Sequence, residues 1–174
     1  MSAVSLLALI PTFAAAAVRS SVLSADEREA ELAPGREALA AISRAAETGS
    51  THSFDLTAWE ALVDVANVAE QLAGARIASN LADDIDLGQQ ILAEMIVASR
   101  LSAGRWLAGR AQVPPLKQLL WVYDVQLQHC SRGELEEARA RVRTMARQAL
   151  AGHAPPGVIV HEASAPVAQE RRQR

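Results

Sequence analysis

Apolar residues between Ser24 and Ala151 recur at the three- and four-residue spacing of amphipathic helices. In the segment 57–80, one apolar stripe begins at Trp59 and a second at Val65, which predicts a central helix covered on two faces. The sequence lacks the alternating β-branched runs, bounded by turn residues, that indicate strands. The pattern therefore predicts an all-α fold, a compact bundle of four to six helices with a mobile C-terminal tail.

Local signals place the helix ends. Three pairs have the spacing of a capping box, in which a hydroxyl and a carboxylate cap each other's backbone N–H groups: Ser24 with Glu27, Thr57 with Glu60, and Ser131 with Glu134. The Pro-Gly pair at 34–35 predicts a break in the first helix. We therefore expect a short helix from 25 to the Pro-Gly pair, and further helices over 36–47, 57–80, 85–109, 116–128 and 132–151.

The chain is predicted to divide into three parts. Residues 1–23 form an apolar N-terminal helix or docking segment, 24–151 the helical bundle domain, and 152–174 a disordered tail with too few apolar residues to fold. No basic residue precedes the apolar run 4–18, as a secretory signal requires, and the run is shorter than the roughly 20 residues of a membrane span. We expect a cytoplasmic protein without a membrane span, with a cleaved signal as the alternative.

Charge adds an asymmetry to this picture. The 174 residues carry a formal net charge of −3. Residues 1–99 hold 5 basic and 14 acidic side chains, whereas residues 100–174 hold 12 basic and 6 acidic ones. Two halves of opposite charge are typical of mutual neutralisation within a bundle or across a dimer. The alternative is a separate basic face for an anionic partner.

The sequence offers little to catalysis or metal binding. Cys130 is the single cysteine, so an intrachain disulfide is impossible, and its neighbour His129 would point about 100° away on a helix. The segment 83–94 has the glycine and glutamate of a calcium loop, but Ile85 and Leu87 occupy positions that need oxygen ligands. The sequence also lacks a Glu-x-x-His motif, a nucleophile elbow and a phosphate-binding loop. We expect no enzyme activity, cofactor, metal site or small-molecule substrate.

Four arginines form a lateral stripe on the last predicted helix: Arg132, Arg139, Arg143 and Arg147. A stripe of this kind is typical of a solvated or intersubunit charged face, and it is also a candidate anion or nucleic-acid face. Acidic residues at 134, 136 and 137 crowd the helix start that would reach base edges, which favours the first interpretation.

The three tryptophans, Trp59, Trp106 and Trp121, are large residues in helices otherwise built of small ones. We interpret them as core anchors, with interface hot spots as the alternative. One shared core is expected to hold Trp59, Leu62, Leu92, Met95, Trp121 and Val142.

Four segments carry a family resemblance: WEALVDVANVAE at 59–70, GRW at 104–106, LKQLLWVYDVQLQ at 116–128 and CSRGEL at 130–135. Over about 55–151 the chain resembles small uncharacterised helical proteins encoded by proteobacterial phages and mobile elements. The resemblance implies a genomic setting and no particular activity.

These observations favour a non-enzymatic protein-interaction protein, an adaptor or self-assembling bundle that binds a host protein or a second copy of itself. The alternative is a nucleic-acid-associated regulator that uses the arginine-rich last helix and tail.

Overall fold

The computed structural model describes residues 21–49 and 53–151. Most of the predicted N-terminal segment and all of the predicted tail lie outside these residues. Within them the order is α3 (Ala25–Thr48), α4 (Leu56–Gly74), the 3-10 helix η2 (Ser79–Leu81), α5 (Ala82–Leu101), the 3-10 helix η3 (Arg110–Gln112), α6 (Val113–His129) and α7 (Arg132–Leu150). Extended pairing in the described ranges is limited to one isolated bridge between Val22 and Ser131. The predicted all-α bundle is confirmed.

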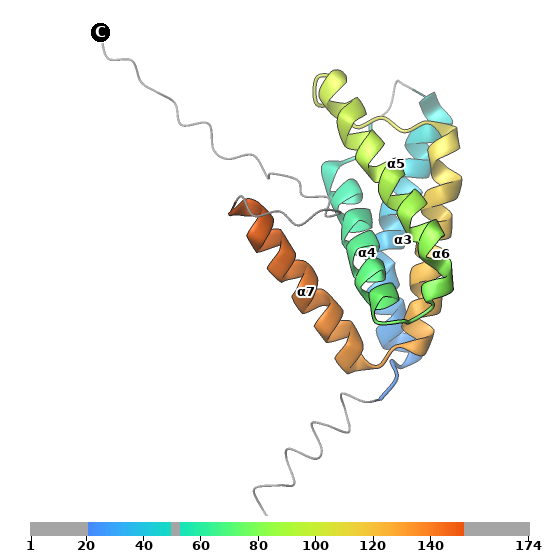
Figure 1. Ribbon diagram of the computed structural model, residues 1–174. Coiled ribbons are helices and arrows are strands. Elements are labelled where there is room, and N and C mark those ends of the chain that lie inside the picture. The colour runs from blue at the N-terminus through green and yellow to red at the C-terminus, as the bar shows by residue number, and fades with distance from the viewer. Residues whose placement is uncertain (1–20, 50–52, 152–174) are drawn as a thin grey trace, which may run out of the picture.

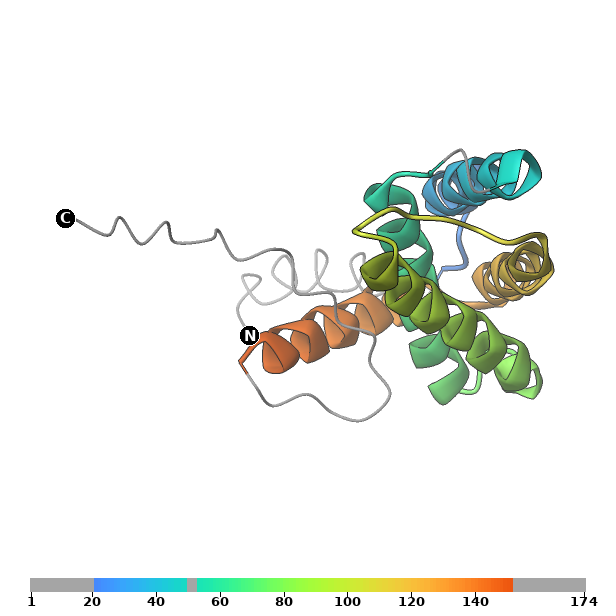
Figure 2. The same cartoon turned by 90° about the horizontal axis from the view of Figure 1, so that it is seen from above.

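The helices form a four-membered group with a fifth attached to it. Figure 1 shows α3, α5 and α6 alongside α4, while α7 leans away from them. The view from above shows α7 extending sideways from the other four (Figure 2). Helix α4 contacts all four other helices, and α7 packs mainly on α4. None of the helices in the described part of the chain is long and apolar enough to cross a membrane.

Two of the three predicted capping boxes are present. The one at Thr57 and Glu60 is not formed, because α4 begins at Leu56 and its N-cap residue, Asp55, makes no side-chain capping hydrogen bond. The Glu27 carboxylate accepts from the Ser24 backbone N–H at 2.8 Å, and the Ser24 hydroxyl accepts from the Glu27 N–H at 3.3 Å. Ser131 and Glu134 repeat this arrangement at the start of α7, with distances of 2.7 and 3.3 Å. The two boxes fix the first turns of α3 and α7, and ion pairs link these two helices.

The predicted break at the Pro-Gly pair is wrong, because α3 continues through Pro34 to Thr48. Its buried face includes Leu32, Ala38 and Ile42, on both sides of the proline. A Cβ placed on Gly35 would lie 2.9 Å from a methyl group of Leu120, so the missing side chain allows α6 to approach closely. Burial of this face outweighs the local cost of the proline.

Two predicted helix ends are also wrong. Helix α5 stops at Leu101 and not at residue 109, because Ala103 and Gly104 have positive φ angles of 54° and 79°. Helix α4 stops at Gly74 and not near residue 80, since Arg76 and Ala78 also have positive φ. Left-handed non-glycine residues carry little sequence signal, and the helical pattern extends across both turns.

Candidate functional site

The predicted arginine stripe on α7 is divided by its contacts. Arg132 forms a two-pronged ion pair with Glu27 of α3, with N–O distances of 2.5 and 2.7 Å. Arg139, two turns later, pairs with Glu31, one turn further along α3. These two arginines therefore join α7 to α3 and are not free to bind a partner's anionic groups.

The other half of the stripe is open. Arg143 and Arg147 are exposed, and neither forms an ion pair with any residue in the described ranges. Arg141, on a neighbouring line of the helix, pairs with Glu137 at 2.6 Å. The spacing of the stripe was predictable, but its division into a bound and a free half depends on α3.

A cavity of about 430 Å³ lies where α7 leaves the other helices. Its apolar lining comes from three helices and includes Pro34 of α3, Val65 and Val68 of α4, and Val142 of α7. Tyr123 of α6 forms its buried end. Sequence analysis did not find this cavity, because its residues come from four helices and share no motif.

Charged side chains complete the cavity: Glu31 and Arg139, which pair with each other, and Asp64 and Arg143. Loss of solvent raises the pKa of Asp64, although the residue as a whole is exposed, and the Arg139 guanidinium opposes that shift. Burial raises the pKa of Tyr123, and the negative charge of Glu31 adds to the effect, so the phenol stays neutral at physiological pH.

The Tyr123 hydroxyl has no hydrogen-bond partner among the described residues. The fully enclosed side-chain atoms without a partner in that part of the chain are Asn67 Oδ1 and Gln126 Oε1. The Tyr123 hydroxyl is not one of them, so we infer that it keeps contact with solvent through the cavity. A polar group in this position is open to a hydrogen bond from whatever occupies the cavity.

Two of the three tryptophans, Trp59 and Trp106, pack in or against the hydrophobic core. Trp59 is fully buried and donates its indole N–H to the Leu92 carbonyl at 2.9 Å. Trp106 is partly buried, and its ring lies 5.2 Å from that of Trp59 and 6.0 Å from that of Phe54. The three rings join the start of α4 to α5 and to the loop that follows α5.

The prediction that Trp121 is a core residue is wrong, because its side chain is 50% exposed. Leu116, Leu119 and Tyr123 carry the buried face of α6, and this places Trp121 on the opposite side of the helix. The predicted core partner Val142 is only partly buried, whereas Leu62, Leu92 and Met95 do share the core with Trp59. Trp121 sits in an apolar run, LLWVY, whose composition does not reveal which face is buried.

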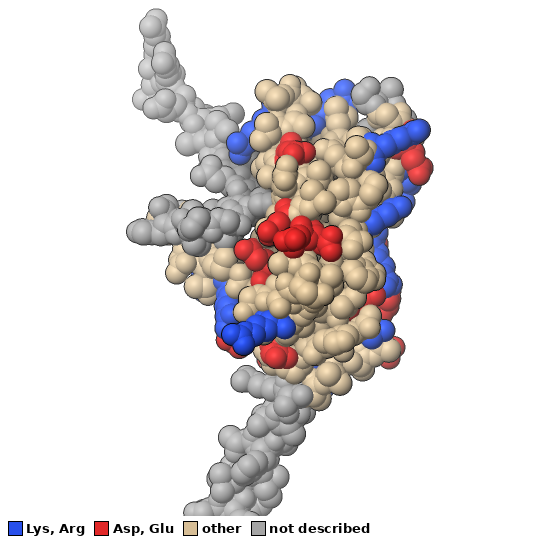
Figure 3. All heavy atoms as spheres, turned by 45° about the vertical axis from the view of Figure 1, so that its right-hand side comes forward, with Lys and Arg blue, Asp and Glu red and all other residues tan. Residues whose placement is uncertain are grey.

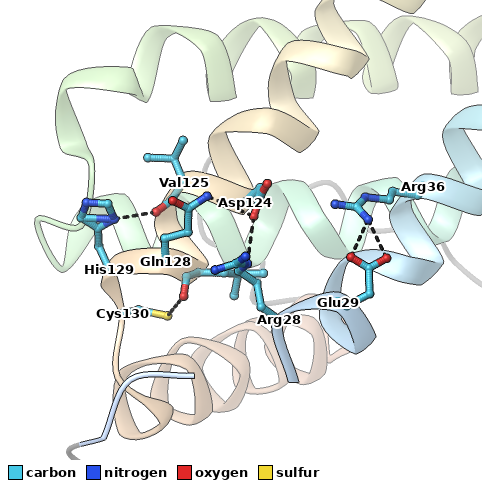
Figure 4. Close-up of polar contacts among 9 residues, drawn as sticks. Arg28, Glu29, Arg36, Asp124, Val125, Gln128, His129 and Cys130 are labelled. Atoms are coloured by element: carbon cyan, nitrogen blue, oxygen red, sulfur yellow. Dashed lines mark hydrogen bonds and ion pairs between the residues drawn. The ribbon is translucent and has the colours of Figure 1, made fainter. Parts of the chain in front are cut away.

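Polar residues surround Trp121 on the outward face of α6. Gln118 reaches Asp84 of α5 at 3.4 Å, and Asp124 pairs with Arg28 of α3 at 3.5 Å. Gln128 also donates to Asp124, at 3.4 Å, as Figure 4 shows. In Figure 3, acidic groups gather near the centre of the face in view and basic groups along its right-hand edge.

Cys130, at the C-terminal end of α6, is not a reactive thiol. Cys130 is fully buried and lies 4.0 Å from the Leu127 carbonyl, and burial raises its pKa to about 11 (Figure 4). His129 is exposed, and its Nδ1 lies 3.0 Å from the Val125 carbonyl. Within the described ranges, His, Cys, Asp and Glu form no cluster of three or more that could hold a metal ion.

Comparison with protein families, curated proteins and solved structures finds no match to this chain. A function is therefore inferred from the geometry of the chain itself.

Proposed function

We propose that this protein binds another protein through the outward face of α6, with Trp121 at the centre of the contact. The observation that carries the proposal is the half-exposed indole of Trp121. Leaving a large aromatic side chain in water forgoes the free energy that its burial would supply. Tryptophan is also among the residues most enriched in the energetic centres of protein interfaces.

The surroundings of Trp121 support this role. Asp124 is already held by Arg28 and Gln128, so part of the polar rim is ordered before a partner arrives. An ordered rim reduces the entropy lost on binding. A central aromatic residue within a polar rim is the usual composition of a protein interface.

Helix α6 also gives Trp121 a rigid base. Leu119, Tyr123 and Leu127 are buried on the opposite side of the helix. Rotation of α6 to bury Trp121 would expose these three side chains, at a larger cost in apolar surface. The exposed indole is therefore a stable feature of the fold and is available to a partner.

The nucleic-acid alternative has less support. It uses the four arginines of α7 together with the tail, and two of the four, Arg132 and Arg139, are neutralised by α3. The remaining pair, Arg143 and Arg147, supplies a small electrostatic contribution. The proposed role is one of binding without catalysis. If the chain is encoded by a phage or mobile element, as the resemblance implies, a host protein is the expected partner.

Site-specific photocrosslinking tests this proposal. A benzophenone amino acid is placed at Lys117, one turn before Trp121 on the outward face of α6, and in a control at Val97 of α5, which is 54% exposed. We expect a discrete protein adduct at position 117 only, and competition by unlabelled wild-type protein but not by Trp121→Ala. Equal adducts at both positions, or equal competition by both proteins, would contradict the proposal. An adduct with a second copy would replace the host partner with self-association.

A further inference from the structure

We propose that residues 4–18 of this chain dock into the cavity between α7 and the α3–α4 pair, so that the N-terminal segment covers the open side of α7. The juxtaposition behind this inference is a partly open cavity beside α7 and the first turn of the same helix, which the segment reaches. The proposal concerns a different face from the outward side of α6 and does not depend on the proposed function.

The cavity exists because α7 is packed along only part of its length. Leu135 and Ala138 are buried against the other helices, and Val142 is the last α7 residue in contact with the core cluster. Beyond this point α7 extends away from the bundle, as both ribbon views show (Figures 1 and 2). The apolar side chains of Val142, Val65 and Val68 therefore line a cavity that stays partly open between α7 and the α3–α4 pair.

The N-terminal segment reaches the bundle at the first turn of α7, about two helical turns before Arg139, the first α7 residue that lines the cavity. The Ser21 carbonyl accepts a hydrogen bond from the Arg132 backbone N–H at 3.0 Å, and Val22 bridges Ser131. The Arg132 side chain also contacts the Ser21 hydroxyl. The chain that precedes Ser21 thus starts beside the first turn of α7, about 17 Å along the helix from Arg143 at a rise of 1.5 Å per residue.

The segment is apolar, and it is long enough to extend from the first turn of α7 to the cavity. Residues 4–18 contain no charged side chain, and as a helix they would span about 22 Å. Leu6, Leu7 and Ile10 fall on one side of such a helix. The ion pair of Glu31 with Arg139 already satisfies two of the charges around the cavity, so an uncharged occupant leaves neither of these groups unpaired.

The unpaired hydroxyl of Tyr123 gives a second reason for an occupant. Tyr123 is 2% exposed and forms the buried end of the cavity. The segment supplies possible partners for this group in the hydroxyls of Ser5 and Thr12. It also contains Pro11, which removes a helical N–H and so frees a backbone carbonyl to accept from a donor such as Tyr123.

Disulfide trapping in the full chain tests the docking. The pair Leu7→Cys with Val142→Cys is compared with Leu7→Cys and Gln128→Cys, whose second site is exposed on α6 near the same end of the bundle. Cys130 remains in place, since its buried thiol does not compete. We expect an intramolecular disulfide in the first pair at least about tenfold faster than in the control. Equal rates would overturn the proposal, and a disulfide-linked dimer whose yield rises with concentration would assign the cavity to a second copy.

Hydrogen exchange of the full chain gives an independent readout. Leu7→Asp would place a charge in the docked face, so we expect faster exchange in 139–149 and no change in α4, whereas Ser2→Asp adds the same charge outside the segment and leaves both unchanged. Unaltered exchange in 139–149 contradicts the docking. Intact mass of the protein from its own host must include residues 4–18, and a chain that begins near Ser20 would overturn the proposal.

Discussion

Helices α4 and α7 have the same length of 19 residues but opposite roles. Helix α4 buries ten residues and contacts every other helix. Of the α7 residues whose side chains are described, only Leu135 and Ala138 are buried, and the ion pairs of Arg132 and Arg139 add to its attachment. Packing therefore fixes α4 over most of its length, whereas α7 is attached by two buried residues and two ion pairs. Loss of one α7 ion pair should cost less stability than loss of a core side chain of α4.

Among the changes that test this comparison, removal of the Trp59 side chain from α4 should lower the stability of the protein most. Trp59→Ala deletes a fully buried ring and its hydrogen bond to Leu92, and we expect it to lower the free energy of unfolding by about 3–5 kcal/mol. Chemical denaturation measures the loss. Trp121→Ala serves as the control and should cost less than about 1 kcal/mol, since its side chain is half-exposed. Similar losses for the two variants would place both indoles in the core.

A substitution at the close contact between α5 and α6 should cause the next largest loss of stability. A Cβ on Gly88 would lie 2.9 Å from both Cβ and a methyl carbon of Leu119. We expect Gly88→Ala to destabilise the protein by about 1–3 kcal/mol, as overpacking does. Gly74→Ala is the matched control, because a Cβ there has no neighbour within 4 Å, and it should be neutral or slightly stabilising. A gain in stability from Gly88→Ala would show that the two helices are farther apart.

The division of the arginine stripe predicts a weak dependence of nucleic-acid binding on salt. In a chain whose tail arginines 171, 172 and 174 are replaced by Gln, two free arginines on α7 should lower the affinity for DNA only about tenfold between 50 and 200 mM salt, whereas four would lower it about 150-fold. Fluorescence titration of a DNA duplex measures this slope. Gln at 143 and 147 should flatten it. A slope of the four-arginine size, or submicromolar affinity at about 150 mM salt, would restore the nucleic-acid interpretation.

Low pH should weaken the ion pair between α3 and α7 and so lower the stability of the protein, by less than the substitutions above. Hydrogen bonds from Arg132 and Ser24 lower the pKa of Glu27 from 4.5 to about 2. Since the folded-state pKa is lower, the contribution of Glu27 to stability is complete above about pH 4.5 and is lost as the pH falls toward 2. Glu27→Gln should flatten this part of the stability profile, and Glu37→Gln on the same helix should not. Identical profiles for wild type and Glu27→Gln would show that the ion pair does not hold α7.

The features that the sequence predicted correctly are local. A capping box needs only residues three apart, so the starts of α3 and α7 were predictable. The apolar periodicity of α4 identified it as the central helix. The end of α5 was not predictable, because its left-handed Ala103 looks like any other alanine. The helix break predicted at Pro34 was wrong for the opposite reason. The proline is a strong local signal, but packing of α3 against helices distant in sequence outweighs it.

The candidate site was predictable only in part. Helical spacing placed the four arginines on one stripe, but the carboxylates that bind Arg132 and Arg139 lie 105 and 108 residues away in sequence. The exposure of Trp121 depends on which side of α6 meets α4 and α3. That choice is made by the whole bundle and has no signature within the LLWVY run.

The affinity of the crosslinked partner for Trp121→Ala tests the central claim most directly. The partner crosslinked at position 117 is titrated with wild-type protein, with Trp121→Ala and with Val97→Ala, a control exposed to a similar extent on α5. We predict that Trp121→Ala weakens binding by at least about tenfold, or 1.4 kcal/mol, while the protein stays folded and loses less than about 1 kcal/mol of stability, as expected for an interface hot spot. Val97→Ala should bind like the wild type. Equal affinities for all three proteins would contradict the assignment of Trp121 to a protein-binding face.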